Sequence, residues 1–513
     1  MVRRGRSSNA AVAVATALAL ILAACGSTSH KHSAAKKGLN GLTADSSPTS
    51  STDVTPVTDA SGKPVPAAAR GVRTSGSGAK TGAAPAKGNA PVPGVSIGGT
   101  AHGINLKNGT ITLGEAWADA AAQSAALSAI GAGDLAPGDP KLFEQTVIND
   151  MNKNGGILGL KVLPAYHEVK VQDDPASSEQ ATCDAWTKDT PGGVFAGFGP
   201  SAYSLGDCLE QRGVARLSAG FGLSDEAEYK RDPHFYETAL NLNRVATESV
   251  DGLAVQNYFA PYFPTGTKIG VLTYDTPNFN RALNDSLLPA LARRKLPAPE
   301  VVKFIFPPSL PNSATFGSQM NNAVLKFSSQ HIDHVIILEA GGRILLEFTQ
   351  RAERASYRPR YGLNSANGAT TLARLNALPK AQLHNSLMVG WIPQTDQSIE
   401  DYPDNTGSAS RQHCLQIMKD AGYKFVGGND RVTALIYCEV HWLLKASLEA
   451  GGKAISLDSY LAGIKALQGR FDTSVTFGAD FRAHHDGVSA GRDATFVDGC
   501  TCFRYTGGQF PIP

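Results

Sequence analysis

The feature that most constrains the fold is an alternation of strand-like and helix-like segments that begins near residue 109. Residues 110–117, TITLGEAW, are strand-like, whereas residues 140–156, PKLFEQTVINDMNKNGG, carry apolar side chains at helical spacing and end in two glycines. The alternation continues to about residue 220. Strands that alternate with helices pair in parallel. The sequence therefore predicts an α/β fold with a parallel sheet.

The same alternation restarts at residues 267–275, TKIGVLTYD. It continues through a buried strand pattern at residues 333–342, DHVIILEAGG, and reaches residues 360–365, RYGLNS. We therefore expect two consecutive α/β units rather than one. About 400 residues lie in this part of the 513-residue chain, which is enough for two cores.

The N-terminus has the composition of an export signal. Three arginines precede an apolar run over residues 10–22, which is shorter than the 20 or so apolar residues of a membrane span. Leu22, Ala23, Ala24 and Cys25 resemble a bacterial lipobox, in which the cysteine receives a diacylglycerol. We predict that residues 1–24 are a lipoprotein signal peptide and that Cys25 is lipidated. The alternative is an ordinary cleaved signal followed by an incidental cysteine.

Residues 25–105 are dominated by Ser, Thr, Ala, Pro and Gly. Such a segment cannot bury enough apolar surface to offset the loss of conformational entropy on ordering, and we expect a disordered tether. The net charge is only +2, and no dense basic stripe is present. This composition argues against a nucleic-acid partner.

Several segments together resemble the type I solute-binding proteins of ABC importers, the leucine/isoleucine/valine-binding class of periplasmic binding proteins. The resembling segments are 151–162 (MNKNGGILGLKV), 267–283 (TKIGVLTYDTPNFNRAL), 332–342 (IDHVIILEAGG), 355–365 (ASYRPRYGLNS) and 434–452 (ALIYCEVHWLLKASLEAGG). The resemblance spans about residues 109–510. It implies two Rossmann-like lobes, each a parallel sheet flanked by helices, joined by a three-strand hinge.

The resemblance also implies which parts of the chain form each lobe. Lobe I would contain residues 106–241 and 391–470, and lobe II would contain residues 242–390 and 471–513. The three crossovers would lie near residues 240–242, 390–394 and 469–473.

Ligands of open parallel sheets bind beyond the carboxyl ends of the strands, where loops and helix N-termini converge. On lobe I this argument selects Ser201, which follows a strand and precedes a helix, as part of a carboxylate site. The alternative is a plain helix N-cap. In the resembling family, this loop and the next strand end bind the ligand's carboxylate. The candidate ligand-binding residues on lobe I are Trp117, Ser201, Ala202, Ser218, Gly220 and Gly222.

Lobe II would contribute residues from three strand ends. Amino-acid binders of the resembling family commonly place an acid at the last of these turns, but this chain has Asn364 and Ser365 there. Glu339 is the neighbouring acid that could supply the charge, or else it caps a helix or is solvated. The candidate ligand-binding residues on lobe II are Tyr274, Phe279, Glu339, Gly341, Asn364 and Ser365.

Six cysteines remain if Cys25 carries lipid, and an exported protein can keep disulfides. The pairs that we favour are Cys183 with Cys208, Cys414 with Cys438, and Cys500 with Cys502. The first two pairs are close in sequence and would join neighbouring helices. The third closes a small ring, so Cys500 or Cys502 could instead pair elsewhere or stay free. A thiolate metal or redox site is the alternative for that pair.

No catalytic motif has the sequence context that it needs. The G-x-S-x-G strings at 94–98 and 487–491 do not follow a strand and open a helix, and AHHDG at 483–487 is a weak metal pattern. We expect no enzyme activity, cofactor or metal. The expected function is a lipid-anchored, monomeric receptor on the extracytoplasmic side of the cell membrane. It would capture a small polar solute, such as an amino acid or a related carboxylate or amide, for ABC permease subunits. The alternative is a ligand sensor on the same scaffold.

The lipid prediction can be tested by substituting the cysteine. Two or more acyl chains hold a protein at a bilayer because each buried methylene contributes about 0.8 kcal/mol. Cys25→Ser should therefore abolish incorporation of labelled palmitate and move the protein from the membrane fraction to the soluble fraction. Cys500→Ser serves as the control and should keep both the label and the membrane location. Labelled Cys25→Ser protein would contradict the prediction.

Overall fold

The computed structural model describes residues 94–117, Ser124, 135–169, 175–198, 203–219, 223–261, 266–306 and 313–513. The predicted signal peptide, Cys25 and most of the expected tether lie outside these residues. So do four candidate ligand contacts, namely Ser201, Ala202, Gly220 and Gly222. Among the residues described, no helix is long and apolar enough to cross a bilayer.

The first sheet has six strands, and all of its pairings except one are parallel. Strand β3 lies between β4 and β5, the order continues through β6 to β7, and β2 adds to β3 in the antiparallel sense. The strands are β2 (Ile104–Asn105), β3 (Thr110–Trp117), β4 (Lys161–Glu168), β5 (Ala196–Phe198), β6 (Ala215–Ser218) and β7 (Phe235–Glu237).

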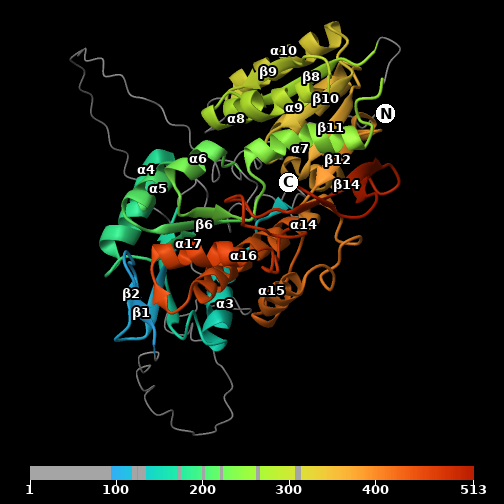
Figure 1. Cartoon of the computed structure of the whole chain (residues 1–513). Coiled ribbons are helices and arrows are strands. Elements are labelled where there is room, and N and C mark those ends of the chain that lie inside the picture. Colours follow the sequence, from blue (N-terminus) through green and yellow to red (C-terminus); the bar gives the residue numbers. More distant parts are fainter. Residues whose placement is uncertain are drawn as a thin grey trace, which may run out of the picture. The chain divides into compact units, whose positions relative to one another are not determined.

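Helices from two separate stretches of the chain belong to this first unit. From the first stretch come α3 (Pro140–Lys153), α4 (Pro175–Asp184) with the π-helical turn η3 (Ala185–Asp189), α5 (Tyr203–Gln211) and α6 (Glu226–Arg231). From the second come α15 (Ala409–Asp420), α16 (Gly428–Gly451) and α17 (Leu457–Ala466). Helix α16 packs against α3, α15 and α17 and reaches β6. Residues 409–466 therefore complete the unit that residues 104–237 begin (Figure 1).

The amphipathic pattern of α3 explains its place in the core. Asp139 caps its N-terminus by accepting a hydrogen bond from the Leu142 backbone N–H, and Pro140 occupies the first turn. Phe143 and Val147 are completely buried and belong to the same core cluster as Leu113 of β3. The face predicted from the apolar spacing is the buried face.

The second sheet has five parallel strands in the order β9-β8-β10-β11-β12, followed by antiparallel β14 and β15, with β16 paired to β14. The strands are β8 (Ile269–Tyr274), β9 (Glu300–Phe304), β10 (His334–Leu338), β11 (Arg360–Asn364), β12 (Leu387–Gly390), β14 (Ala490–Val497), β15 (Cys502–Tyr505) and β16 (Phe510–Pro511). The C-terminal strands thus finish a sheet that began more than 200 residues earlier in the chain, at β8.

The helices of the second unit alternate with its parallel strands, and Figure 1 shows α8, α9 and α10 beside β8, β9 and β10. They are α7 (Leu242–Val255), α8 (Pro277–Ala282), the π-helical turn η4 (Leu283–Leu287), α9 (Leu288–Arg293), α10 (Ser313–Ser329), α11 (Arg343–Arg354), the 3-10 turn η6 (Ser365–Asn367), α12 (Ala369–Arg374), α13 (Lys380–Leu383) and α14 (Pro393–Asp396). The α/β fold with parallel sheets flanked by helices, predicted from the alternation, is confirmed.

The folded chain begins before residue 106. Strand β1 (Ser96–Ile97) pairs in parallel with β13 (Ala454–Ile455), which links this end of the chain to the α16–α17 turn. The Gly103 backbone N–H donates to the Gly192 carbonyl at 2.8 Å. Residues 94–105 fall in the range expected for the tether, but these backbone pairings make them part of the fold. Pairing with a distant segment leaves little signal in local composition.

The chain passes between the two sheets three times: after β7, after β12, and again before β14. Two of these connections are tied to each other, because Glu237, at the end of β7, forms a parallel bridge with Asp486. The Asp486 carboxylate also accepts hydrogen bonds from the backbone and side-chain amides of Asn241 at 3.1 Å. Arg244, in the first turn of α7, forms an ion pair with Asp486, with 2.6 Å between Nη1 and Oδ2.

All six remaining cysteines are paired in the structure. Cys183–Cys208 joins α4 to α5, and Cys414–Cys438 joins α15 to α16. The third disulfide, Cys500–Cys502, closes the turn between β14 and β15.

The Asp486 pair makes a prediction about stability. Asp486 is completely buried and the Arg244 side chain is 11 % exposed, so Arg244→Ala would leave an uncompensated buried carboxylate. We expect the free energy of unfolding to fall by about 3–5 kcal/mol. The matched control is Arg293→Ala, whose side chain is 58 % exposed beside Asp251 and should cost less than about 1 kcal/mol. Urea denaturation measures both variants, and equal losses would contradict this prediction.

Candidate functional site

The candidate residues of the second sheet are brought together at its carboxyl edge. Strands β8, β10 and β11 are neighbours, so the turns that follow them lie side by side. The Tyr274 ring packs edge-on against Phe279 with 5.3 Å between ring centroids, and its hydroxyl lies 3.5 Å from Glu339 Oε2. The Gly341 N–H donates to the Ala366 carbonyl at 2.8 Å. Residues expected from three separate turns thus form one contiguous cluster.

Glu339 caps helix α11. Its two carboxyl oxygens accept hydrogen bonds from the backbone N–H groups of Ile344 at 2.7 Å and Leu345 at 2.9 Å. The side chain is completely buried, and burial raises its pKa to about 8 even though the backbone donors act in the opposite direction. Of the three possibilities considered from the sequence, the structure shows helix capping and rules out a solvated side chain. A contact between Glu339 and a ligand stays a prediction.

Asn364 and Ser365 organise the end of β11. Asn364 accepts a hydrogen bond from the Ala366 N–H and caps the 3-10 turn η6 together with Asn367. The Ser365 hydroxyl donates to Asp396 Oδ2 at 2.8 Å and accepts from the Trp391 N–H at 2.7 Å. Both side chains are completely buried. Ser365 therefore connects this strand end to the segment that leaves the second sheet after β12.

Asp396 belongs to the same cluster, and the sequence analysis did not identify it. Its Oδ2 accepts hydrogen bonds from Ser365, from the Tyr505 hydroxyl at 2.7 Å and from the Ile392 N–H at 3.1 Å. Burial raises its pKa to about 7, although these donors favour the ionised form. Tyr505 lies 109 positions away in sequence, so no local pattern could have revealed the contact.

On the first sheet, the structure describes two of the six candidates. Trp117 ends β3, and the Lys141 ammonium lies 4.8 Å from its ring centroid. Ser218 ends β6 and is 8 % exposed, and its carbonyl accepts from the Thr238 N–H. Strands β3, β5 and β6 are adjacent and parallel, so both residues lie at the same edge of this sheet. This is the geometry that ligand sites of parallel sheets use.

A buried acid cluster lies beside Trp117, and it too was missed. Glu115 of β3 and His441 of α16 form a hydrogen bond, with 2.8 Å between Oε1 and Nε2. Both side chains are completely buried. Burial, followed by the charge of Glu115, raises the pKa of Glu144 on α3 to about 10. Glu144 therefore holds a proton at neutral pH. In the sequence, each of these acids stands alone within an apolar pattern, so nothing indicated a cluster. Only the packing of α3 and α16 on β3 brings these groups together.

The loop that follows β6 touches helix α8, which follows β8. The Asn278 side-chain amide donates to the Leu223 carbonyl at 2.9 Å, and Arg281 Nε lies 2.5 Å from Asp225 Oδ2. Asp225 is completely buried and also caps α6. Segments that follow strands of the two sheets are therefore in direct contact, with Asp225 and Arg281 as the ion pair between them.

One group of side chains in the described part of the chain has the composition of a metal site. Glu226, His484 and Asp486 each offer a ligand atom, all within 4.8 Å of one another. However, Asp486 is already paired with Arg244 at 2.6 Å, and this positive charge opposes a cation at the same carboxylate. We assign no metal to this group.

Comparison with known proteins shows which fold this is. No protein-family model matches the chain, and no curated protein matches it. A leucine-bound ABC transporter substrate-binding protein of Desulfitobacterium hafniense is 14 % identical, with a TM-score of 0.52 over 77 % of this chain and 100 % of that one. A substrate-binding protein of Aeropyrum pernix is 14 % identical, with a TM-score of 0.55 over 79 % and 96 % of the two chains.

The chain has the fold of the type I periplasmic binding proteins. A fatty acid ABC transporter substrate-binding protein of Thermomonospora curvata shares it at 13 % identity and a TM-score of 0.54, over 81 % of this chain and 95 % of that one. At such identities the similarity establishes the fold and leaves the individual ligand contacts to the residues of this chain.

The capping carboxyl makes a prediction about pH. The pKa of Glu339 is raised from 4.5 to about 8, so the folded state keeps a proton that the unfolded state has lost. This contribution to stability is complete below about pH 4.5 and disappears as the pH rises through about 8. The unfolding free energy of the parent protein should therefore fall as the pH rises from about 6 to about 9. In Glu339→Gln, which has no carboxyl at this position, the fall should be smaller by about 1–3 kcal/mol.

The readout is the difference between the two pH values, measured by urea denaturation at each. It cancels any constant cost of placing an amide beside the α11 backbone N–H groups. The matched control is Glu449→Gln, because Glu449 is exposed at the end of α16. If the pH dependence of Glu339→Gln equals that of the parent and the control, Glu339 does not carry the raised pKa.

Proposed function

We propose that this protein is a lipid-anchored, extracytoplasmic solute-binding protein that captures a small polar solute and delivers it to an ABC importer. The observation that carries the proposal is the contact between the loop after β6 and helix α8 after β8, at Leu223 with Asn278 and at Asp225 with Arg281. Parallel α/β sheets bind ligands at their carboxyl edges, and here two such edges contribute segments to one region.

The proposed mechanism is closure of two lobes around the solute. A ligand that contacts both sheet edges makes all of its contacts only in the closed state, so binding shifts the equilibrium toward that state. The Asp225–Arg281 pair supports this proposal because it joins the segments across which a ligand would bridge. The permease would then recognise the closed form.

The residues of the chain favour a solute with a carboxylate or another oxyanion. Ser201 and Ala202 precede α5, whose first backbone N–H groups lack partners within the helix and attract negative charge. Ser218, Gly220 and Gly222 would supply further donors after β6. The leucine and the fatty acid named for two proteins of this fold both carry a carboxylate, which is the shared chemistry that we carry over to this chain.

The second sheet supports a solute without a strongly basic centre. Both Glu339 oxygens are hydrogen-bonded to backbone N–H groups, and Ser365 and Asp396 are bonded to each other. At the end of β11, Asn364 and Ser365 stand where the resembling family's amino-acid binders commonly place an acid. The acid at the end of β8, Asp275, is exposed and accepts a hydrogen bond from the Asn280 side-chain amide. We therefore place carboxylates and amides with aromatic or apolar bodies ahead of simple amino acids, with Trp117, Tyr274 and Phe279 beside the apolar part.

Attachment to the membrane is proposed through lipid on Cys25. Residues 26–93 would then separate the fold from the bilayer, and a chain of this composition has a root-mean-square span of about 5–6 Å times the square root of its length, or about 50 Å. That reach is enough for a monomer to dock on permease subunits while it stays anchored. The protein would face the extracytoplasmic side, where its three disulfides persist.

The test is a thermal-shift screen of the purified full-length protein against pooled carboxylates, amides and amino acids, with L-leucine and a long-chain fatty acid as single probes. A ligand at 100 times its dissociation constant adds about 2.7 kcal/mol to the stability of the folded state, which is an easily measured shift. A solute that binds should also reduce the radius of gyration in solution scattering. A scattering curve that a bound solute leaves unchanged would contradict closure.

The site is then tested by calorimetry with the solute that the screen identifies. Ser201→Ala should weaken binding about tenfold or more, because an oxyanion loses one hydrogen bond, which is worth about 1.5–3 kcal/mol when charged. The matched control is Ser329→Ala, an exposed serine at the end of α10 whose hydroxyl bonds only to the Lys326 carbonyl. Equal affinity of both variants would remove Ser201 from the site and leave the proposed function intact.

A further inference from the structure

We propose that Cys500–Cys502 is a redox-active disulfide, which exchanges reversibly with an external dithiol while the other two disulfides stay intact. The proposal does not rest on solute binding. It rests on the position of this pair in the fold, on the backbone between the two cysteines, and on a carboxylate that can accept a hydrogen bond from the thiol formed by reduction.

The three disulfides differ in what they hold together. Cys183–Cys208 and Cys414–Cys438 each connect two helices and close loops of 25 and 24 residues. Cys500–Cys502 spans a separation of 2 and holds only a hairpin turn. The chain entropy that a cross-link removes from the unfolded state grows with the size of the loop. Opening the small ring therefore costs the fold the least.

The turn between these cysteines has a strained backbone. Thr501 has φ +52°, in the left-handed region. A β-branched residue rarely adopts this conformation, because its side chain crowds the backbone there. Gly499 lies next to the pair, yet the left-handed position is occupied by threonine. Strained, accessible disulfides are the labile ones, whereas buried, relaxed disulfides resist reduction.

Only one of the two sulfurs is open to attack. Cys500 is half-buried and follows the exposed residues Asp498 and Gly499, whereas Cys502 is completely buried at the start of β15. Both cysteines of Cys414–Cys438 are completely buried, whereas Cys183–Cys208 joins a completely buried cysteine to the half-buried Cys208. An incoming thiolate would therefore meet the Cys500 sulfur first.

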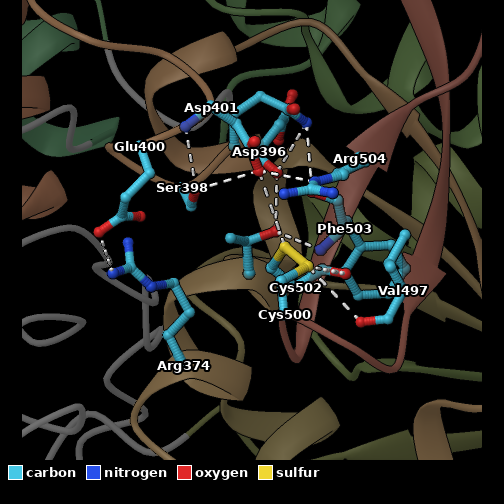
Figure 2. Close-up of a disulfide and its surroundings, with 12 residues drawn as sticks. Arg374, Asp396, Ser398, Glu400, Asp401, Val497, Cys500, Cys502, Phe503 and Arg504 are labelled. Atoms are coloured by element: carbon cyan, nitrogen blue, oxygen red, sulfur yellow. Dashed lines mark hydrogen bonds and ion pairs between the residues drawn. A yellow bond between two sulfur atoms is a disulfide. The ribbon is translucent and has the colours of Figure 1, made fainter.

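The surroundings are suited to the reduced form. Figure 2 shows Asp401 and Arg504 beside the disulfide. Asp401 Oδ2 lies 3.9 Å from Cys502 Sγ and 2.9 Å from Arg504 Nε, and hydrogen bonding to Arg504 lowers the pKa of Asp401. Asp401 therefore stays ionised and can accept a hydrogen bond from the Cys502 thiol once the disulfide opens. The buried Cys502 thiol formed by reduction thus has a hydrogen-bond acceptor nearby.

The exchange is a two-electron reduction in two steps. A thiolate of the dithiol attacks Cys500 Sγ, the Cys500–Cys502 bond breaks, and the Cys502 sulfur leaves with the electron pair and takes up a proton. The second thiolate of the reductant then attacks the reductant sulfur of the mixed disulfide. The Cys500 thiolate is released and takes up a proton. The dithiol becomes a disulfide and loses two electrons and two protons, which the protein gains. The natural co-reactant would be a dithiol of an extracytoplasmic oxidoreductase.

Reduction of this disulfide would also affect contacts outside the turn. Strand β15 carries Phe503, whose N–H donates to the Thr370 hydroxyl at 3.2 Å, and Tyr505, whose hydroxyl donates to Asp396. Asp396 in turn holds Ser365 at the end of β11. Loosening the turn that begins β15 therefore acts on the carboxyl edge of the second sheet.

The experiment equilibrates the full-length folded protein with dithiothreitol at graded ratios of dithiol to disulfide. Free thiols are trapped with iodoacetamide, and each cysteine is quantified by peptide mass spectrometry. Cys500 and Cys502 should be half-alkylated at a ratio at least tenfold lower than the other four disulfide cysteines. Near-UV circular dichroism at that ratio should show a folded protein, and oxidised dithiothreitol should restore the pair.

The two larger disulfides are the controls within the same molecule. The double variant Cys500→Ser with Cys502→Ser should consume no reducing equivalents at the lower ratio, which assigns the exchange to this pair. The proposal is overturned if all three disulfides open at the same ratio, if Cys500 and Cys502 react only when circular dichroism shows unfolding, or if they react last.

Discussion

The structure depends on parallel strand pairing in two separate sheets. Because β8, β10 and β11 run in the same direction and are neighbours, the turns after them share one edge, and β3, β5 and β6 do the same in the first sheet. A single reversed strand would move its turn to the opposite edge. The cluster of Tyr274, Glu339 and Ser365 exists because no strand among these is reversed.

The polar groups at these edges are organised largely by burial. Glu339 and Asp396 are acids inside the protein, and for both of them desolvation is the dominant cause of a raised pKa. Each is hydrogen-bonded to backbone N–H groups, so each holds a turn or a helix end in place. Together they give the second sheet a rigid carboxyl edge.

Much of the fold was predictable because its signals are local. The strand pattern of 110–117, the helix of 140–156 and the run before Glu339 each carry their periodicity within a few residues. The positions of the candidate residues at strand ends followed from the same patterns. Their environment did not follow: Glu339 caps α11, and Ser365 bonds to Asp396, which the sequence analysis had not selected. Residues 94–105 were assigned to the tether because their partners lie elsewhere in the chain.

The sequence by itself determined the α/β alternation, the two units and the change of composition near residue 100, since each of these depends on neighbouring residues. Only the tertiary structure decided which distant groups meet. The Tyr505–Asp396 contact, the Glu115–His441 pair and the bond from Arg244 to Asp486 join residues 109 to 326 positions apart. Such contacts form because a buried polar group needs hydrogen-bond partners, and the identity of those partners depends on the whole fold.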